Sequence, residues 1–490
     1  MTRRKRLVAY GILGAVALIS RAVGWGWGFP LKFGHIDESV VLFYSLRIVD
    51  GAWAPGFFDY PGFFFYVLAG VLRATQTLGH WAGWVPSMGE LLSGYLNGDS
   101  RFFLLTARGL SMVFGLATVA LTVDMGRRRA GESVGWAAGV LLAVNPLHVL
   151  HCHYGTVDVA AAFLTLLALD RIDVFWANPT RRNGLGAAVA VGLGAATKYY
   201  PGILWLLVVA EPFWRRRPRA AAWAAVLTVA ALGAYAVGSP ETLVSIREFA
   251  RRFGHLFPKI VGAPGTAIPL VSTVRGLSEG LGPLVLGGAL VGVVRVLRGG
   301  PPGKVIVAGA GLLLGFIGFW RGQSPHYALA LYPVAALLAV QGFQWTGRRH
   351  RWCPAVLWGM SILLCLGGDA RDWAMLRARD SRLEAGDWVR AHVAPGAKIL
   401  RSAHTPEFGA RDGYSVKVDF TNQSFSDWAS GGPIPDSLRG YDLLIYATYE
   451  KADDAVLKVF MNHFPLRQSF ARRPPRFPHH PRVFIFDGHG

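Results

Sequence analysis

Two adjacent carboxylates follow the first apolar segment of the chain. Asp37 and Glu38 lie in the stretch HIDES and open a segment whose pattern predicts a helix to about Val49. Partial desolvation near a membrane surface raises the pKa of a carboxyl group toward the range of a general base. Acids are also favoured in the first turn of a helix by its dipole and as helix caps. Base chemistry and helix capping are therefore both open for this pair.

Three histidines and one acid cluster in HVLHCHYGTVD. His148 and His151 are spaced so that both can lie on one helical face, and His153 and Asp158 follow them. Such groups can bind a metal ion, but histidines in apolar surroundings more often make structural hydrogen bonds. No acidic ligand at a diagnostic spacing completes a metal site. We therefore assign no metal ligand and no certain cofactor, and leave a divalent metal open.

Basic residues stand where a membrane protein rarely has them. Lys198 and Arg321 each end an apolar run at a short loop, and Arg47 lies in the first long loop. Positive charge in such loops indicates a functional role, for example the binding of a lipid phosphate. Contacts with anionic head groups are an alternative. The stretch RGQSPHYALALYPVAALLA adds His326 and Tyr327 at the start of a late apolar run, where interfacial tyrosines are also common.

The elements that must position these residues are predicted to be membrane spans. Apolar residues make up 52% of the 490 residues and charged residues only 16%, against about 25% charged in soluble proteins. A bilayer is crossed by roughly 17–25 apolar residues. About eleven runs approach this length: Leu7–Trp25, Leu104–Met125, Val134–Leu150, Val157–Trp176, Gly184–Thr197, Pro201–Phe213, Ala220–Val237, Gly280–Val296, Val305–Trp320, Tyr327–Trp345 and Cys353–Leu366.

The distribution of charge predicts the orientation of these spans. The formal net charge is +20, and the basic residues concentrate at the N-terminus and in alternate loops, as is typical of cytoplasmic segments. The charge is therefore a topology signal and does not indicate a nucleic-acid partner. We expect a protein integral to the cell (inner or plasma) membrane, with a cytoplasmic N-terminus and a large first outer loop. Within this loop, Phe63–Leu72 is expected to lie along the interface as a helix.

The composition changes after Leu366, where amphipathic and alternating patterns replace the long apolar runs. These patterns predict helices at Ser381–Val393 and Lys451–His463, and strands at Lys398–Ser402, Tyr414–Phe420, Tyr441–Tyr449 and Arg482–Asp487. We therefore expect an α-helical polytopic membrane domain over residues 1–368 and a small extracytoplasmic α/β domain over residues 369–490.

Several segments of the membrane part, taken in order, resemble the GT-C glycosyltransferases of the family-39-like group. They are HIDES, DYPGFFFYVL, ARGLSMVFGLATVALTVDMGRRRAG, HYGTVDVAAAFLTLLAL, GLGAAVAVGLGAATKYYPG and HYALALYPVAALLA. That group includes protein O-mannosyltransferases, aminoarabinose transferases that act on lipid A, and transferases of lipopolysaccharide cores. The resemblance implies a GT-C fold with a large first outer loop, and catalysis at the extracytoplasmic membrane face.

The resemblance also implies roles for individual residues. Asp37 matches the acid that accepts the proton of the acceptor hydroxyl during inverting transfer, and Glu38 lies beside it. Asp158 matches the family acid at the start of the fourth span, and Lys198 matches the lysine of a KGxPG-like segment. The donor implied is a polyprenyl-phosphate sugar, and the acceptor is a lipid, a glycan or a protein.

Two segments depart from the pattern of the family. Asp59-Tyr60-Pro61-Gly62 stands where many members have Lys-Pro-Pro-Leu, so one lysine contact to phosphate is missing. His326-Tyr327 replaces a late Arg-Tyr pair, with Arg321 nearby. The candidates for substrate binding are Lys198, Arg321, His326, Tyr327, Arg47, Tyr60 and His153. The partners expected are the donor, the acceptor and membrane lipids, and the alternative function is that of a transporter or lipid flippase.

Overall fold

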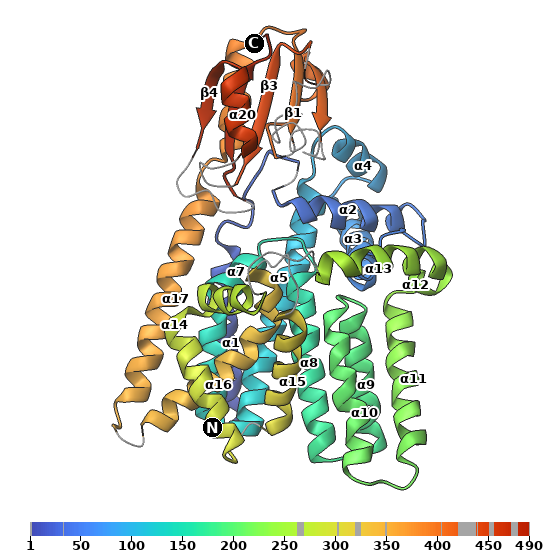
Figure 1. The fold of residues 1–490 in the computed structure, drawn as a ribbon, viewed down its shortest axis with the longest axis vertical. Coiled ribbons are helices and arrows are strands. Elements are labelled where there is room, and N and C mark those ends of the chain that lie inside the picture. The colour runs from blue at the N-terminus through green and yellow to red at the C-terminus, as the bar shows by residue number, and fades with distance from the viewer. Residues whose placement is uncertain are drawn as a thin grey trace. The chain divides into compact units, whose positions relative to one another are not determined.

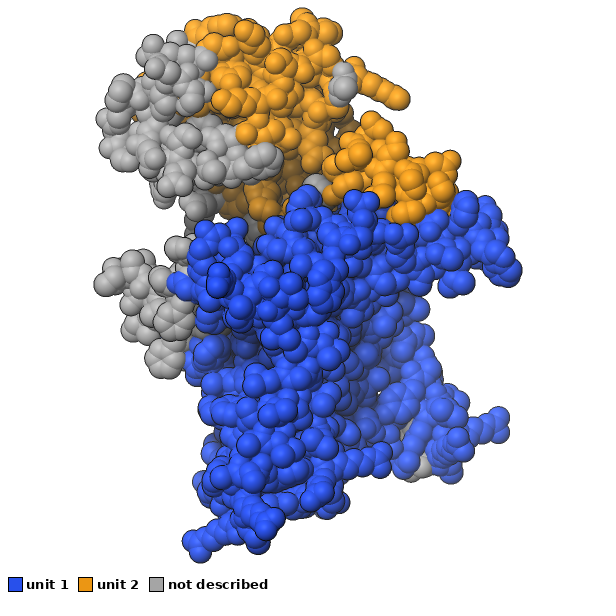
Figure 2. All heavy atoms as spheres, turned by 90° about the vertical axis from the view of Figure 1, so that its right-hand side faces the viewer, with its two compact units in different colours: residues 1–25, 40–84, 103–373 blue, residues 26–39, 85–102, 374–490 orange. Residues whose placement is uncertain are grey.

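The computed structural model describes residues 2–489 except 33, 262–268, 301–302, 319–324, 348–349, 403, 420–437, 439, 450–454 and 472–478. The chain forms two compact units, which are coloured separately in Figure 2. Unit 1 comprises Met1–Trp25, Val40–Trp84 and Phe103–Trp373, and unit 2 comprises Gly26–Ser39, Val85–Phe102 and Ala374–Gly490. Unit 2 thus combines the tail with two segments of the predicted first outer loop, and the domain boundary at residue 369 stays a prediction.

Most of the chain is helical (Figure 1). The helices are α1 (Arg3–Ala22), α2 (Ile36–Val49), α3 (Phe63–Trp81), α4 (Met88–Leu96), α5 (Arg101–Ala130), α6 (Glu132–Ala143), α7 (Pro146–His151), α8 (Asp158–Ala177), α9 (Arg181–Ala195), η1 (Tyr200–Leu204), α10 (Trp205–Trp214), α11 (Ala220–Gly238), α12 (Glu241–Val244), α13 (Ile246–Val261), α14 (Pro269–Leu297), α15 (Lys304–Gly318), η2 (Pro325–Leu331), α16 (Tyr332–Thr346), α17 (Cys353–Arg377), α18 (Ser381–His392), η3 (Ala410–Asp412) and α20 (Ala455–His463).

Several of these helices are suited to a bilayer. In the part of the chain that the structure describes, five stretches are long and apolar enough to cross one: Arg101–Ala130, Ala220–Gly238, Thr273–Leu297, His326–Thr346 and Cys353–His392. Three further apolar helices are shorter: Glu132–Ala143, Tyr200–Trp214 and Lys304–Gly318. The α-helical polytopic class is confirmed, and the chain is an integral membrane protein. The number of eleven spans and the orientation of the termini stay predictions.

Glycines allow α14 and α16 to pack closely. A Cβ atom added to Gly292 would lie 2.0 Å from the carbonyl oxygen of Leu338. A Cβ atom added to Gly342 would lie equally close, at 2.0 Å, to the carbonyl oxygen of Gly288. Small residues at helix interfaces let backbones meet in a membrane, where no hydrophobic force between helices assists packing. Gly292 and Gly342 are therefore required by backbone contact.

One predicted span is interrupted. The apolar run Val134–Leu150 predicts a single span, but α6 ends at Ala143 and α7 begins at Pro146. Asn145 caps α7, since its side chain accepts the backbone N–H of His148 at 3.0 Å. Proline suits the first position of a helix because it has no N–H that would need a partner there. The Asn-Pro pair therefore starts a new helix and redirects the histidine segment.

α3 is longer than the sequence predicted, because it continues from Phe63 to Trp81. Its buried side chains recur at helical spacing and form one apolar stripe: Phe64, Phe65, Leu68, Ala69 and Leu72. An amphipathic helix of this kind suits a membrane interface. Its location along the interface stays a prediction.

Unit 2 contains a five-stranded sheet with the order β2-β1-β3-β5-β4. Its strands are β1 (Lys398–Ser402), β2 (Ser415–Asp419), β3 (Leu443–Thr448), β4 (Leu466–Phe470) and β5 (Arg482–Asp487). β1 pairs in parallel with β2 and β3, whereas β5 pairs antiparallel with β3 and β4. The four predicted strands are confirmed. The sequence missed β4, an exposed edge strand whose LRQSF stretch lacks apolar alternation.

Helices cover both faces of this sheet. Alternate residues of a strand point to opposite faces. On one face, Tyr446 of β3 stacks on Phe460 of α20 with ring centroids 5.5 Å apart. On the other face, Ile445 of β3 shares a buried cluster with Val389 of α18. Unit 2 is therefore a small α/β layered domain, as the tail sequence predicted.

Candidate functional site

A buried ion pair joins two of the candidate residues in unit 1. Asp158 is the first residue of α8, and Lys198 follows α9 just before the η1 turn. The Lys198 Nζ atom lies 2.5 Å from Asp158 Oδ1, and the two side chains are only 12% and 7% exposed. The second carboxylate oxygen, Oδ2, accepts the hydroxyl of Thr156 at 2.9 Å. The carboxylate is thus held from two sides at the start of its helix.

The environment keeps Lys198 charged. Burial by itself lowers the pKa of a lysine. The neighbouring Asp158 carboxylate outweighs this effect, and the pKa of Lys198 is raised above its usual value. An ammonium group has three donor hydrogens, and the Asp158 contact uses one. Lys198 is therefore a positively charged donor at a buried position, which suits an anionic ligand.

Two late candidates complete the cluster. His326 of η2 lies 4.0 Å from Asp158 Oδ1 through its Nε2 atom. The Tyr327 ring is 5.0 Å from Lys198 Nζ and 4.6 Å from the His326 ring. His151 of α7 approaches His326 with ring centroids 5.5 Å apart. The structure therefore brings together Asp158, Lys198, His326 and Tyr327, which the sequence proposed separately.

The other two histidines of the motif have structural partners. His153 is fully buried, and its ring nitrogens lie 2.9 Å from the Val149 carbonyl oxygen and 2.8 Å from that of Val23. The Nδ1 atom of His148 lies 2.8 Å from the buried Arg21 guanidinium. Both contacts tie helices of unit 1 together, so the structural role that the sequence left open fits His148 and His153 best.

The two carboxylates of HIDES are distinguished by their surroundings. Glu38 is fully buried, and its Oε2 accepts the backbone N–H of His35 at 3.0 Å, so it caps the start of α2. Asp37 has a side chain that is 41% exposed and lies 3.9 Å from His35 Nδ1, which also accepts the Asp37 N–H at 3.0 Å. Asp37 is therefore the more accessible of the two carboxylates.

The remaining candidates have contacts of their own. Arg47 donates to the carbonyl oxygen of Pro55 at 2.7 Å and thereby fixes the loop after α2. Tyr60 packs edge-on against Phe57 with ring centroids 4.8 Å apart. Arg321 lies outside the described residues. Asp37 and Glu38 belong to unit 2, whereas the cluster belongs to unit 1.

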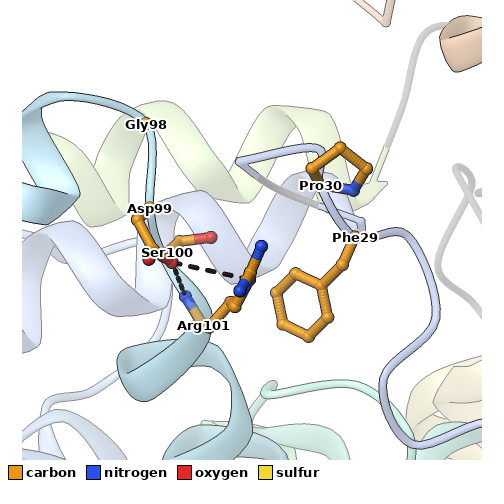
Figure 3. A pocket seen from close by; sticks show the side chains of 6 residues that line it. All are labelled: Phe29, Pro30, Gly98, Asp99, Ser100 and Arg101. Carbon is orange, nitrogen blue, oxygen red and sulfur yellow. Dashed lines mark hydrogen bonds and ion pairs between the residues drawn. The ribbon is translucent and has the colours of Figure 1, made fainter.

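The described residues contain no group of three or more His, Cys, Asp or Glu side chains that could hold a metal ion. A small open pocket of about 190 Å³ in unit 2 is lined by Phe29, Pro30 and residues 98–101. Figure 3 shows the Arg101 side chain extending toward the Phe29 ring, and its Nε lies 3.8 Å from Asp99 Oδ1. Because the Arg101 side chain is 65% exposed, solvent screens its charge, and the pocket is a weaker anion site than the buried Lys198 cluster.

Sequence reasoning missed several buried acids, and Glu241 is one of them. Glu241 opens α12 and is fully buried in unit 1. Its Oε2 accepts the backbone N–H of Gly56 at 3.2 Å, and its Oε1 has no hydrogen-bond partner among the described residues. A Cβ atom on Gly62 would lie 2.8 Å from that Oε1. A lone acid directly after the apolar run Ala220–Val237 was the only signal in the sequence.

The comparisons with known proteins agree with this architecture. Residues 95–243 match the family model described as dolichyl-phosphate-mannose-protein mannosyltransferase. The structure is similar to that of ArnT from Cupriavidus metallidurans bound to undecaprenyl phosphate, with a TM-score of 0.55 at 13% identity, over 100% of this chain and 98% of that one. The chain has a GT-C fold. The resemblance to GT-C glycosyltransferases that the ordered segments indicated is confirmed.

A second group of solved structures is also similar to this chain. The oligosaccharyltransferase AglB from Archaeoglobus fulgidus, in complex with an inhibitory peptide and a dolichol-phosphate, matches with a TM-score of 0.52 at 11% identity, over 98% of this chain and 74% of that one. An Archaeoglobus fulgidus oligosaccharyltransferase in complex with Zn and sulfate matches with a TM-score of 0.51 at 12% identity, over 96% of this chain and 72% of that one. No curated protein matches the sequence of this GT-C chain.

Proposed function

We propose that the chain is a glycosyltransferase that moves a sugar from a polyprenyl-phosphate-linked donor to a lipid, glycan or protein acceptor at the extracytoplasmic membrane face. The observation that carries the proposal is the buried Lys198–Asp158 pair with His326 and Tyr327 beside it. A fixed cation in a water-poor site stabilises charge that develops on a leaving group far better than a solvated one does. A donor carried by a membrane lipid suits such a site.

Asp37 is the proposed base. In inverting transfer, the acceptor hydroxyl oxygen attacks C1 of the sugar as the bond from C1 to the phosphate oxygen breaks. The proton of the hydroxyl passes to the Asp37 carboxylate, and the electron pair of the broken bond stays on the lipid phosphate. The exposure of Asp37 and the capping role of Glu38 support this division of labour. Glu38 then fixes the turn and takes no part in proton transfer.

Lys198 is proposed to stabilise the departing phosphate. Asp158 would orient the ammonium group and keep it protonated, and His326 and Tyr327 would line the same side of the ligand. Arg321 stays a proposed second contact to the phosphate. The contacts of His153 with backbone carbonyls support a structural role for this residue.

The proposed orientation rests on the positive-inside rule. The basic residues at the N-terminus and in alternate loops support a cytoplasmic N-terminus. The HIDES segment and the tail would then lie outside the cytoplasm, where polyprenyl-phosphate donors serve in place of nucleotide sugars. The supply of activated sugar by a lipid also agrees with the lack of a G-x-G-x-x-G fingerprint.

Asp37→Asn in the purified, reconstituted protein tests the proposal. Transfer is measured from a panel of polyprenyl-phosphate-linked hexoses and pentoses to lipid, glycan and peptide acceptors. The amide cannot accept the proton, so kcat should fall by about 10²–10⁴-fold. Asp50→Asn, an exposed carboxylate at the far end of α2, is the matched control and should retain full activity.

Two results would contradict the proposal. Full activity of Asp37→Asn would remove Asp37 as the base. Movement of the labelled donor lipid across the bilayer without any sugar transfer would favour a transporter or flippase instead.

A further inference from the structure

The parallel strands of unit 2 end at an edge of the sheet that commonly serves as a binding site. β1 and β3 run in the same direction, so the loops that follow them leave from the same edge. In open α/β sheets, ligands bind in the crevice outside the carboxyl ends of such strands. In unit 2, residues after these strands include His404 and Tyr449, whose rings lie 5.4 Å apart. This edge of the sheet is therefore a candidate contact surface within unit 2.

A segment of the same unit, just before Asp37, contacts the loop that leaves β1. The backbone N–H of Lys32 donates to Glu407 Oε2 at 2.9 Å. On its other side, the Lys32 carbonyl oxygen accepts the hydroxyl of Ser100 at 2.6 Å. Both backbone groups of one residue are thus held by side chains that are distant in sequence. Such contacts fix the course of the backbone itself.

A second anchor comes from α18. The Arg382 guanidinium is 5% exposed and forms two hydrogen bonds of 2.8 Å with the Asp380 carboxylate, one from Nε and one from Nη2. The same Nη2 atom also reaches the carbonyl oxygen of Gly34 at 3.3 Å. A two-point pair between arginine and a carboxylate has a fixed geometry. Arg382 therefore presents its donor to Gly34 in one orientation.

From Gly34 to Asp37 the chain has little freedom. His35 donates its N–H to Glu38, and its ring accepts the N–H of Asp37. The Ile36 carbonyl oxygen accepts the hydroxyl of Ser39 at 2.6 Å, so each residue between Gly34 and the proposed base is hydrogen-bonded. Farther back, the Trp27 ring packs on His479 with centroids 4.2 Å apart. The anchor at Gly34 therefore acts on a short, hydrogen-bonded connection to Asp37, and the anchored Lys32 lies two positions before Gly34 in the sequence.

We propose that Glu407 and Arg382 are positioning residues that hold the Asp37 carboxylate in its reactive orientation, so that the α/β tail serves as the support of the base. The inference rests on the proposed function, since it needs Asp37 as the base. A displacement of about 1 Å in a reacting group can cost on the order of 10²-fold in rate. Loss of one backbone anchor should therefore reduce kcat without removing any group that touches the substrate.

Glu407→Ala and Glu407→Gln test this role in the full-length, reconstituted protein. The alanine removes the acceptor for the Lys32 N–H, whereas the glutamine keeps an amide oxygen at the same position. Alanine should lower kcat by about 10- to 100-fold with the donor KM within about twofold. Glutamine should restore most of kcat. Asp412→Ala is the matched control, because Asp412 also accepts a backbone N–H, that of Gly409 at 2.7 Å, but within the tail.

The outcomes separate the two proposals. If Asp37→Asn is inactive while Glu407→Ala has the kcat of the natural protein, the positioning role is refuted and the proposed function stands. If Glu407→Ala and Glu407→Gln are equally impaired, a general structural role replaces positioning, and the same holds if Asp412→Ala is impaired as much. If Asp37→Asn is fully active, both the assignment of Asp37 as the base and the positioning role of Glu407 and Arg382 are refuted.

Discussion

Replacement of Glu241 by glutamine should change how the stability of the protein depends on pH. Glu241 is fully buried beside the loop that contains Gly56 and Gly62. Burial raises the pKa of its carboxyl group from 4.5 to about 7, and the hydrogen bond from Gly56 offsets only part of this rise. The folded protein therefore binds this proton more tightly than the unfolded chain does.

The sign and size of the effect follow from this shift. Stability that comes from protonated Glu241 is fully present below the unfolded pKa of 4.5 and is lost as the pH rises through about 7. One pKa unit corresponds to about 1.4 kcal/mol, so the loss is of the order of 3 kcal/mol. Glutamine has no group at this position that ionises between pH 5 and pH 8. Between pH 5 and pH 8, the stability of Glu241→Gln relative to the natural protein should therefore increase by about this amount.

The measurement is chemical or thermal unfolding in detergent at pH 5 and pH 8, for both proteins. Differences between variant and natural protein cancel the other groups that titrate in this range. Glu279→Gln is the matched control, because Glu279 is 52% exposed and pairs with Arg275 on the surface. If the unfolding curves of Glu241→Gln and the natural protein shift in parallel with pH, the reasoning from burial is refuted.

Two further perturbations have expected outcomes. Lys198→Ala leaves Asp158 as an uncompensated buried charge and should destabilise the protein by about 3–5 kcal/mol. The double variant with Asp158→Asn should recover part of this stability, and unfolding of both variants in detergent measures the difference. Gly292→Ala places a methyl group 2.0 Å from the Leu338 carbonyl oxygen and should lower the free energy of unfolding by about 1–3 kcal/mol. Gly287→Ala places a methyl group with nothing within 4 Å and should leave stability unchanged or slightly increased. Thermal unfolding of the two variants distinguishes backbone packing from helix propensity.

Local patterns in the sequence were sufficient for most secondary structure. The α/β tail was predicted because the short apolar runs in Tyr441–Tyr449 and Arg482–Asp487 are a signal for strands buried on both faces. β4 was missed because an edge strand needs no apolar side chains, only backbone pairing. The break before α7 could have been predicted from Asn145-Pro146, but the continuous apolar character of the segment obscured it.

The candidate site was only partly predictable. Asp158 and Lys198 were identified separately because charges are rare beside apolar runs. Their contact depends on how α8 and α9 pack, which no local pattern contains. The sequence left both helix capping and base chemistry open for Glu38, and the burial of its side chain favours capping. Glu407 gave no signal, because its partner Lys32 lies 375 positions away in the sequence.

That separation has a consequence for biosynthesis. Gly26–Ser39 and Val85–Phe102 are translated early, but their partners in unit 2 follow after most of unit 1 has been made. At ~5–20 residues per second, the 375 positions between Lys32 and Glu407 correspond to roughly 20 to 75 s of synthesis. During this interval the segment before Asp37 lacks its contacts with Arg382 and Glu407. A nascent chain that stalls before the tail is complete can therefore insert its helices and still lack the support of its proposed base, so that activity would appear only at the end of translation.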